Sequence, residues 1–230
     1  MSAAEVGARF AKLGGVFVTP PETIAERLAR VRALVFDWDG VFNAGAKGEG
    51  AASTFTEADS MGTNLLRYAL WQAHGEQLPY CAVITGVDNP SARSFVRREH
   101  FHALLYNVKD KGAALADVCA RQGLEPREVA CVFDDVNDLA MAAACGVRVL
   151  VRRDASPLLL DYAVRRGLAD YVTGLPPDRG AVREAAELML GLAGAFERVV
   201  ASRVAFDADY RRYFEARQAQ RAELLDRAPR

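Results

Sequence analysis

The chain has 230 residues, of which 51% are hydrophobic and 26% charged, and its formal net charge is −1. This balance is typical of a globular protein with a substantial core, and it argues against a nucleic-acid-binding surface or a general attraction to anionic membranes. No run approaches the roughly 18 apolar residues of a membrane span. The first residues, MSAAEVGARFAKLGG, lack the apolar core of a signal peptide. We therefore expect a cytoplasmic protein with neither nucleic acid nor membrane as a partner.

Short apolar runs alternate with helical patterns from residue 32 to about residue 195. The predicted strands are 32–36, 80–85, 102–106, 129–133 and 148–151, with an edge strand at 169–173. The predicted helices are 60–75, 89–100, 111–123 and 136–145. The apolar runs are continuous rather than alternating, which is typical of strands covered on both faces. The pattern predicts a doubly wound, Rossmann-like α/β domain, with a parallel sheet and helices on both faces.

We expect this domain to span 31–195, between two helical extensions at 1–30 and 196–230. Thr19 with Glu22 three residues later predicts a capping-box helix start over 19–30. Residues 196–230 place aromatic side chains at helical spacing, so we expect a helix docked on the domain or on another subunit, which leaves a homo-oligomer open. The four cysteines lack C-x-x-C spacing and predict buried, reduced thiols.

Polar residues follow several of the predicted strands, where ligands bind in an open parallel sheet. In chain order they are Asp37, Asp39, Thr85, Gly86, Lys111, Asp134, Asp135 and Asp138. Five carboxylates against one lysine cannot all stay ionised in a cleft unless a cation neutralises them. Oxygen ligands favour a hard cation, and Mg²⁺ is the first choice because it needs few protein ligands.

The segments DWDGV, ITG, DKGAAL and FDDVNDLAM, taken in order, resemble the four motifs of the haloacid dehalogenase superfamily of aspartate-nucleophile phosphatases. Further on, ADYVT and RGAVREAAELML resemble the capless sugar-acid phosphatase branch, to which the octulosonate 8-phosphate phosphatases belong. No insertion between the motifs is large enough for a separate cap domain.

The resemblance implies that Asp37 attacks phosphorus and forms an aspartyl-phosphate, which splits hydrolysis into two displacements. It implies that Asp39 protonates the leaving oxygen and then activates water. Mg²⁺ would be held by the Asp37 carboxylate, the Asp39 backbone carbonyl and Asp134. Gly40 would let the chain turn sharply behind the acids.

The remaining motif residues would bind and neutralise the phosphoryl group. Thr85 and the Gly86 amide would donate hydrogen bonds to it, and Lys111, rather than Lys109, would neutralise its charge. The remaining acids, Asp135 and Asp138, would orient waters and Lys111. Arg179 and Arg183, in DRGAVRE, would pair with a substrate carboxylate.

Together these features predict a Mg²⁺-dependent phosphomonoester hydrolase acting on a phosphorylated small molecule, a sugar or sugar acid. The alternative is a non-catalytic, phospho-binding regulatory pseudo-enzyme, its site blocked by Phe133 or by the C-terminal helix. Phe133 stands where the family pattern has glycine, and its ring either narrows the site or points into the core. Residues 40–58 stand where the capless branch has a β-hairpin flap, and they are shorter than that flap and rich in Gly and Ala. Asn64 stands where the octulosonate phosphatases have an arginine.

Overall fold

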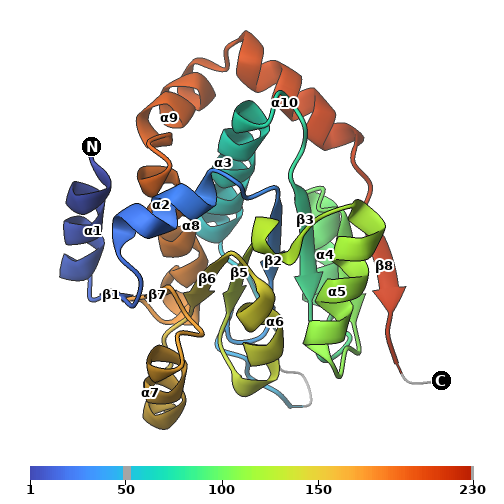
Figure 1. Ribbon diagram of the computed structural model, residues 1–230. Helices are drawn as coiled ribbons and strands as arrows, with labels where there is room; N and C mark the ends of the chain where they lie inside the picture. Colours follow the sequence, from blue (N-terminus) through green and yellow to red (C-terminus); the bar gives the residue numbers. More distant parts are fainter. Residues whose placement is uncertain (49–52, 229–230) are drawn as a thin grey trace.

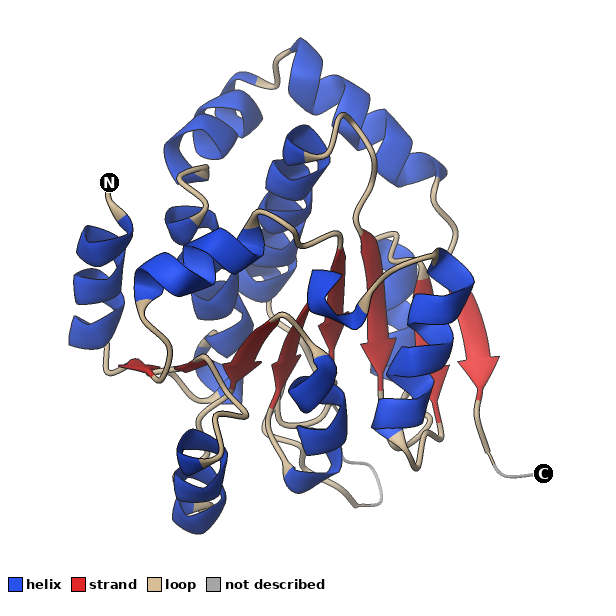
Figure 2. Ribbon diagram, viewed as in Figure 1, coloured by secondary structure: helices blue, strands red, loops and turns tan. Residues whose placement is uncertain are grey.

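A central β-sheet lies between two layers of helices in the computed structural model, which describes residues 1–48 and 53–228 (Figure 2). The strands lie in the order β1-β7-β6-β5-β2-β3-β4-β8, and all neighbours are parallel except β1 and β7. Their bounds are β1 (Val16–Phe17), β2 (Ala33–Phe36), β3 (Tyr80–Ile84), β4 (Ala103–Tyr106), β5 (Val129–Phe133), β6 (Val147–Leu150), β7 (Tyr171–Val172) and β8 (Glu223–Asp226). The predicted doubly wound α/β fold is confirmed.

Helices α5, α6 and α7 pack on one face of the sheet, and α3, α4 and α8 on the other (Figure 1). Helices α1, α2, α9 and α10 extend the second layer. Their bounds are α1 (Ala3–Lys12), α2 (Pro21–Leu28), α3 (Glu57–Ala73), α4 (Pro90–Arg98), α5 (Lys111–Gln122), α6 (Leu139–Ala144), α7 (Pro157–Arg165), α8 (Ala181–Leu192), α9 (Phe196–Ala205) and α10 (Ala208–Ala219). Among the described residues, no helix is long and apolar enough to cross a membrane.

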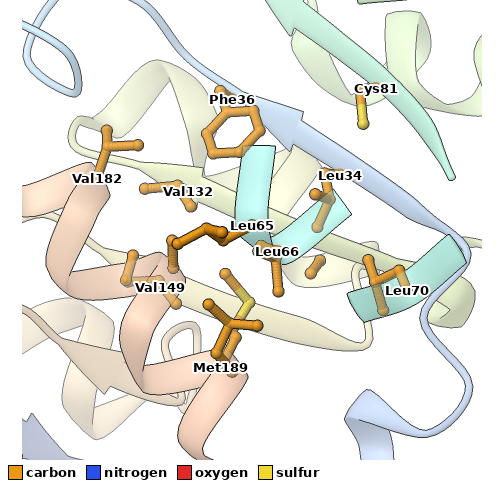
Figure 3. Packing of buried hydrophobic residues seen from close by; sticks show 14 of the residues in the cluster. Leu34, Phe36, Leu65, Leu66, Leu70, Cys81, Val132, Val149, Val182 and Met189 are labelled. Carbon is orange, nitrogen blue, oxygen red and sulfur yellow. The ribbon is translucent and has the colours of Figure 1, made fainter. Parts of the chain in front are cut away.

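The central strand β2 contributes side chains to the hydrophobic core on both faces of the sheet. Leu34 and Phe36 point toward α3 and α8, where they meet side chains such as Leu65 and Met189 (Figure 3), and Val35 points to the opposite layer. Because successive strand residues face opposite sides, a continuous apolar run serves two cores at once. The four cysteines are buried and free, as predicted.

Both ends of the chain contribute strands to the sheet. β1 pairs antiparallel with β7, so the strand predicted at the edge has a further strand outside it. β8 pairs with β4 at the other edge, so 196–230 is not helical throughout. The predicted capping box at Thr19 is wrong: α2 begins at Pro21 without a side-chain cap, and the Thr19 hydroxyl donates to Asp170 Oδ1 at 2.7 Å. The division at 30/31 and 195/196 stays a prediction.

Helices α9 and α10 lie beyond the ends of the strands opposite the arrowheads in Figure 1. The Asn64 side chain on α3 anchors α10, because its amide donates to Tyr210 Oη and its carbonyl accepts from Tyr213 Oη, both at 2.9 Å. Arg217 of α10 also pairs with Glu99 at 2.7 Å. The asparagine that departs from the family pattern is thus bonded to the C-terminal extension.

The chain order fixes where a ligand can enter. From β2 the chain runs outward through β3 and β4, and later from β5 outward through β6 and β7. The connections therefore diverge at the neighbouring strands β2 and β5, and a crevice opens beyond their carboxyl ends.

Candidate active site

A cavity of about 400 Å³ lies beyond the carboxyl ends of β2, β3 and β5. It brings together most of the residues predicted to carry chemistry: Asp37, Asp39, Thr85, Gly86, Lys111, Asp134, Asp135 and Asp138. Strand register explains the convergence. Phe36 pairs with Val83 on β3 and with Val132 on β5, so the three strands end within a residue or two of one another. Their following polar residues therefore project into one space.

Lys111 lines the cavity and bridges two of its acids. Its Nζ is 2.6 Å from Asp37 Oδ1 and 2.5 Å from Asp138 Oδ1, and all three side chains are almost fully buried. Asp110 caps the start of α5 by accepting from the Ala113 backbone N–H, which fixes the first turn that carries Lys111. Burial by itself lowers the pKa of Lys111. The charges of Asp37 and Asp138 raise this pKa by more, so the net shift is upward. The lysine therefore stays charged.

Asp37 lies close to two other cavity acids, Asp134 and Asp138. Burial raises its pKa well above the ordinary value; Lys111 opposes the shift, and Asp138 and Asp134 add to it. Its backbone N–H donates to the Val132 carbonyl at 3.0 Å and continues the pairing of β2 with β5. The carboxylate is held in place, and a further positive charge is needed to keep it ionised.

Asp134 presents one carboxylate oxygen without a partner. Its Oδ2 lies 2.5 Å from Arg153 Nη1, whereas Oδ1 is buried and has no hydrogen-bond partner among the described residues. Burial first, then Asp138, raises the pKa of Asp134 to about 6 against the opposing effect of Arg153. Buried polar atoms are rarely left unbonded, so this oxygen is a candidate ligand atom.

Carboxylate oxygens of Asp37, Asp134 and Asp138 lie within 4.8 Å of one another. An all-oxygen donor set with an excess of negative charge fits a hard divalent cation such as Mg²⁺. Asp138 also accepts hydrogen bonds from the backbone N–H groups of Asp134, at 3.4 Å, and of Asp135, at 3.1 Å. It therefore braces the loop after β5 as well as Lys111. The Asp135 carboxylate accepts from the next residue, Val136, and caps its own turn.

In the site, Gly40 occupies a position that other residues would not fit. Its φ is +91°, and a Cβ there would lie 2.0 Å from Asp134 Oδ2. The predicted sharp turn is confirmed, and the structure adds a second reason for glycine, because the backbone behind Asp39 passes directly against the Asp134 carboxylate.

Thr85 ends β3 in a fixed position. Its backbone N–H donates to the Leu105 carbonyl at 2.9 Å, its carbonyl accepts from the Val108 N–H at 3.1 Å, and the residue is buried. Gly86 follows on the cavity wall. Both residues directly follow β3, whereas Asp134 follows β5 on the other side of β2.

Asp39 lies nearer the cavity mouth. Its carboxylate accepts from Ser53 Oγ at 3.3 Å and from Asn89 Nδ2 at 3.5 Å, and it forms an ion pair with Lys47. Between residues 40 and 56, the described part of the loop contains only an isolated bridge of Asp39 to Asn43 and no hairpin strands. Residues 49–52 of the predicted flap lie outside the described residues.

Arg179 and Arg183 do not line the cavity, so the structure does not bring them to the site. Arg183 lies on α8, where its Nη2 is 2.5 Å from Glu187 Oε1 and its backbone N–H donates to Asp59. A helical i, i+4 partner satisfies this guanidinium without a substrate. The ring of Phe133 is fully buried in the core under α5 and α6 and does not narrow the site.

Sequence reasoning missed two cations of the cavity wall, Lys47 and Arg153. Arg153 follows β6, beside β5, and lies outside the four motifs. Its only sequence signal was a charged residue just past a strand's carboxyl end. Lys47 lay in a Gly- and Ala-rich segment whose course the sequence does not specify. The cavity is completed by Gly45, Val87, Val108, Lys109 and Asn137.

A parallel sheet with a buried lysine and clustered carboxylates at its topological switch point defines an α/β enzyme suited to phosphoryl transfer. A scan against family models finds none that matches the chain. Individual proteins do match. The 3-deoxy-D-manno-octulosonate 8-phosphate phosphatase of Salmonella typhi is 31% identical over 198 residues, which cover 84% of this chain and 95% of that protein.

Solved structures agree with this match. The Yersinia pestis phosphatase of the same name is 29% identical, with a TM-score of 0.62, and the match covers 76% of this chain and 89% of that one. The Moraxella catarrhalis phosphatase, solved with magnesium, phosphate and a KDO molecule, is 23% identical and shares the fold, with a TM-score of 0.64 over 78% of this chain and 97% of that one. The chain belongs to the haloacid dehalogenase superfamily of hydrolases. The predicted enzyme class, a phosphatase, is confirmed at the level of this family.

Proposed function

We propose that the chain is a Mg²⁺-dependent phosphomonoester hydrolase that works through an aspartyl-phosphate on Asp37. One observation carries the proposal: the buried Oδ1 of Asp134, which has no hydrogen-bond partner among the described residues, lies in the same cluster as Asp37 and Asp138, whose carboxylates share Lys111. Buried carboxylate oxygens in a purely structural cluster are rarely left without a hydrogen bond. This one is short of positive charge and retains an open ligand atom.

Asp37, Asp134 and the backbone carbonyl of Asp39 would hold the Mg²⁺ ion. When bound, such an ion neutralises the carboxylates and polarises the phosphoryl oxygens. Asp138 is bonded to Lys111 and to two backbone N–H groups, so we assign it to orienting the lysine and the loop after β5. The same lysine, held between two acids, would supply its positive charge to the phosphoryl group.

The reaction follows from these positions as two displacements. The Asp37 carboxylate forms a bond to phosphorus while the bond to the leaving oxygen breaks, and Asp39 gives that oxygen a proton. Water then attacks the acyl phosphate, Asp39 takes a proton from it, and phosphate leaves as Asp37 is regenerated. Thr85 and the Gly86 N–H would donate hydrogen bonds to the transferring group.

The proposed substrate is a phosphorylated sugar or sugar acid, on the strength of the relatives' names. Neither of the two features suggested to block the site of a pseudo-enzyme, the Phe133 ring and the C-terminal helix, lies in the cavity. The Phe133 ring lies in the core, and none of the described residues after 195 lines the cavity. A homo-oligomer stays a prediction.

The direct test is hydrolysis of p-nitrophenyl phosphate by protein stripped with EDTA and then supplied with Mg²⁺. We expect turnover with Mg²⁺ and none above background without it. A protein that binds vanadate in the presence of Mg²⁺ but releases no nitrophenol would instead support the regulatory alternative. A screen of phosphorylated sugars and sugar acids would then rank substrates.

A further inference from the structure

A second cavity, of about 210 Å³, lies at the amino ends of the strands, opposite the arrowheads in Figure 1. The residues that line it, which define the arginine cavity, are Arg27, Arg30, Arg127, Cys145, Gly146 and Arg148. They follow α2 or precede and begin β5 and β6, and because β2, β5 and β6 are parallel neighbours, their amino ends meet at one edge of the sheet. The five residues of β5 separate this edge from the active-site cavity by roughly 16 Å, at the usual rise of a strand.

Positive charge dominates the arginine cavity. Four of its six lining residues are arginines, and none of the described lining residues is acidic. One carboxylate, Asp170, serves both Arg27, at 2.8 Å, and Arg148, at 2.7 Å. Both Asp170 oxygens already accept several hydrogen bonds, so this acid cannot also neutralise the other two arginines. A cleft lined by charges of one sign focuses their field and attracts small ions of the opposite sign.

The inner two arginines are held in place and still keep donors for a ligand. The Arg148 side chain is 15% exposed, and it donates to Asp170 from Nε and Nη2 and to the Gly167 carbonyl from Nη1, at 2.6 Å. Arg27 donates to Asp170 from Nη1. A guanidinium has more N–H groups than these contacts use, so both side chains can also bind an anion that enters the cavity.

The outer two arginines are free to turn toward such an anion. Arg127 pairs with Glu125, but the two side chains are 68% and 59% exposed, and an ion pair in water is weak because the solvent competes for both charges. Arg30 is exposed and forms no ion pair with any residue that the structure describes. Neither side chain gives up a strong partner when it binds a ligand.

Backbone packing fixes the wall between the inner and outer arginines. A Cβ on Gly146 would lie 2.0 Å from the Arg127 carbonyl oxygen, and the Gly146 N–H donates to the Val129 carbonyl at 3.0 Å. The neighbouring Cys145 is buried, and its Sγ donates to the Met141 carbonyl at 3.4 Å. The segment before β6 therefore holds Arg127 at a set position beside the start of that strand.

The size and the donors of the cavity indicate which anion it takes. Pockets for drug-sized ligands have about 300–1,000 Å³, so a cavity of about 210 Å³ admits a smaller molecule or one end of a larger one. Guanidinium groups bind phosphate oxygens in pairs of parallel hydrogen bonds. A phosphate has more oxygens than a carboxylate and can therefore be bound by more of the arginines at once.

We propose that Arg27, Arg30, Arg127 and Arg148 form a second ligand site, which binds inorganic phosphate or the terminal phosphate group of a small molecule. The inner pair provides a fixed platform, and the outer pair closes over the anion. The site does not depend on the proposed phosphatase function, because it lies at the opposite edge of the sheet and uses none of the residues assigned to that reaction.

Calorimetric titration of phosphate into EDTA-treated protein tests the site, in about 0.15 M NaCl to screen unspecific attraction. Without a metal ion the carboxylates of the active-site cavity repel phosphate. We expect saturable binding to wild type and at least tenfold weaker binding to the Arg30→Gln, Arg127→Gln double variant. The matched control, Arg9→Gln with Arg211→Gln, removes the same charge at exposed positions outside the cavity and should bind within twofold of wild type. So should Lys111→Met, which alters the active-site cavity instead.

The double variant changes only the outer arginines because the inner pair balances Asp170. Each single variant should lose part of the affinity, which keeps the test valid if melting temperatures show that the double variant does not fold. Phosphate binding that the outer arginines do not affect, or that the control pair weakens equally, would overturn the proposal. So would binding that Lys111→Met abolishes, or no saturable binding to wild type.

A parallel titration with glycerol 3-phosphate distinguishes the two sources of the phosphate group. Tighter binding of glycerol 3-phosphate than of phosphate, lost in the same double variant, would assign the site to a phosphorylated small molecule. Tighter binding of phosphate would assign it to the free anion. Equal affinity of the double variant and wild type for both ligands would show that the arginines form no site.

Discussion

Two buried aspartates, one before the start of a strand and the other after the end of a parallel strand, differ in how completely they are hydrogen-bonded. Asp170, just before β7, is fully bonded. Its Oδ1 accepts from Thr19, Arg27 and Arg148 at 2.7–2.8 Å, and its Oδ2 accepts from the Arg148 backbone N–H at 2.9 Å. Asp134, just after β5, has one arginine on Oδ2, and its Oδ1 has no partner in the part of the chain that the structure describes.

The difference distinguishes a structural acid, Asp170, from Asp134, which we propose to be a metal ligand. Asp170 ties the N-terminal extension to the sheet through Thr19 and Arg27, and nothing more can bind to it. Asp134 lies among other acids with too little positive charge nearby, and its pKa rises to about 6. An acid in a cavity with a raised pKa and an unbonded oxygen is a candidate ligand-binding residue, and a fully bonded acid is typical of a structural role.

The strongest test of this comparison removes the proposed nucleophile. Asp37→Asn should lower turnover of p-nitrophenyl phosphate by more than a thousandfold, because an amide can neither attack phosphorus nor supply a full charge. The melting temperature of the EDTA-treated protein should hold or rise, since a buried charge is lost. Activity above one percent of wild type would show that Asp37 is not the nucleophile.

Asp170→Asn should lower stability and leave activity nearly unchanged. It leaves Arg27 and Arg148 without their shared partner, and breaking such a pair should lower the free energy of unfolding by about 3 kcal/mol, the low end for buried pairs because both arginines are partly exposed. Urea unfolding measures this loss, and Asp154→Asn, at an exposed pair with Arg152, is the control. Activity should stay within a factor of two. A large loss of kcat would contradict a purely structural role for Asp170.

Magnesium should stabilise only the site. At about 100 times its dissociation constant, Mg²⁺ should raise the free energy of unfolding by about 2.7 kcal/mol, seen as a higher melting temperature. Asp134→Asn should abolish most of this gain, and Asp170→Asn should keep it although its baseline is lower. A melting temperature that ignored Mg²⁺ in the wild type would contradict the metal-dependent function.

Acid should lower the free energy of unfolding through His102, which precedes β4 at the strand ends opposite the active-site cavity. Burial first, then Arg67, lowers the pKa of His102 to about 4, and its Nδ1 accepts from the Cys81 backbone N–H at 3.1 Å. Because the unfolded chain binds this proton more readily, the stability is complete above the ordinary pKa of about 6.5 and is lost as pH falls toward 4.

From pH 7.5 to pH 5 the loss assigned to His102 is about 2 kcal/mol. Urea unfolding at both pH values should show it in wild type and not in His102→Asn, which keeps an acceptor but does not titrate. Equal pH dependence in the two proteins would mean that His102 titrates normally when folded.

Much of the fold followed from local patterns that the sequence states directly. The run that became β5 is apolar throughout and was predicted with its final bounds, 129–133, because a strand buried on both faces leaves no polar position inside it. The motif acids were located at the carboxyl ends of strands for the same reason: polarity begins where burial stops. Gly40, too, could be read as a turn beside the acids.

The sequence alone could not place groups whose position depends on distant segments. The spacing of Arg179 and Arg183 fitted carboxylate recognition, yet the packing of α8 puts Arg183 beside Glu187 and outside the cavity. Thr19 looked like a helix cap until Asp170, 151 residues away, proved to be its partner. Lys47 and Arg153 lie 106 residues apart and meet at one cavity only because β2, β5 and β6 are neighbours in the sheet. Residue types and their spacing fix local chemistry, whereas strand order decides which charges face each other, because an ion pair depends on distance in space.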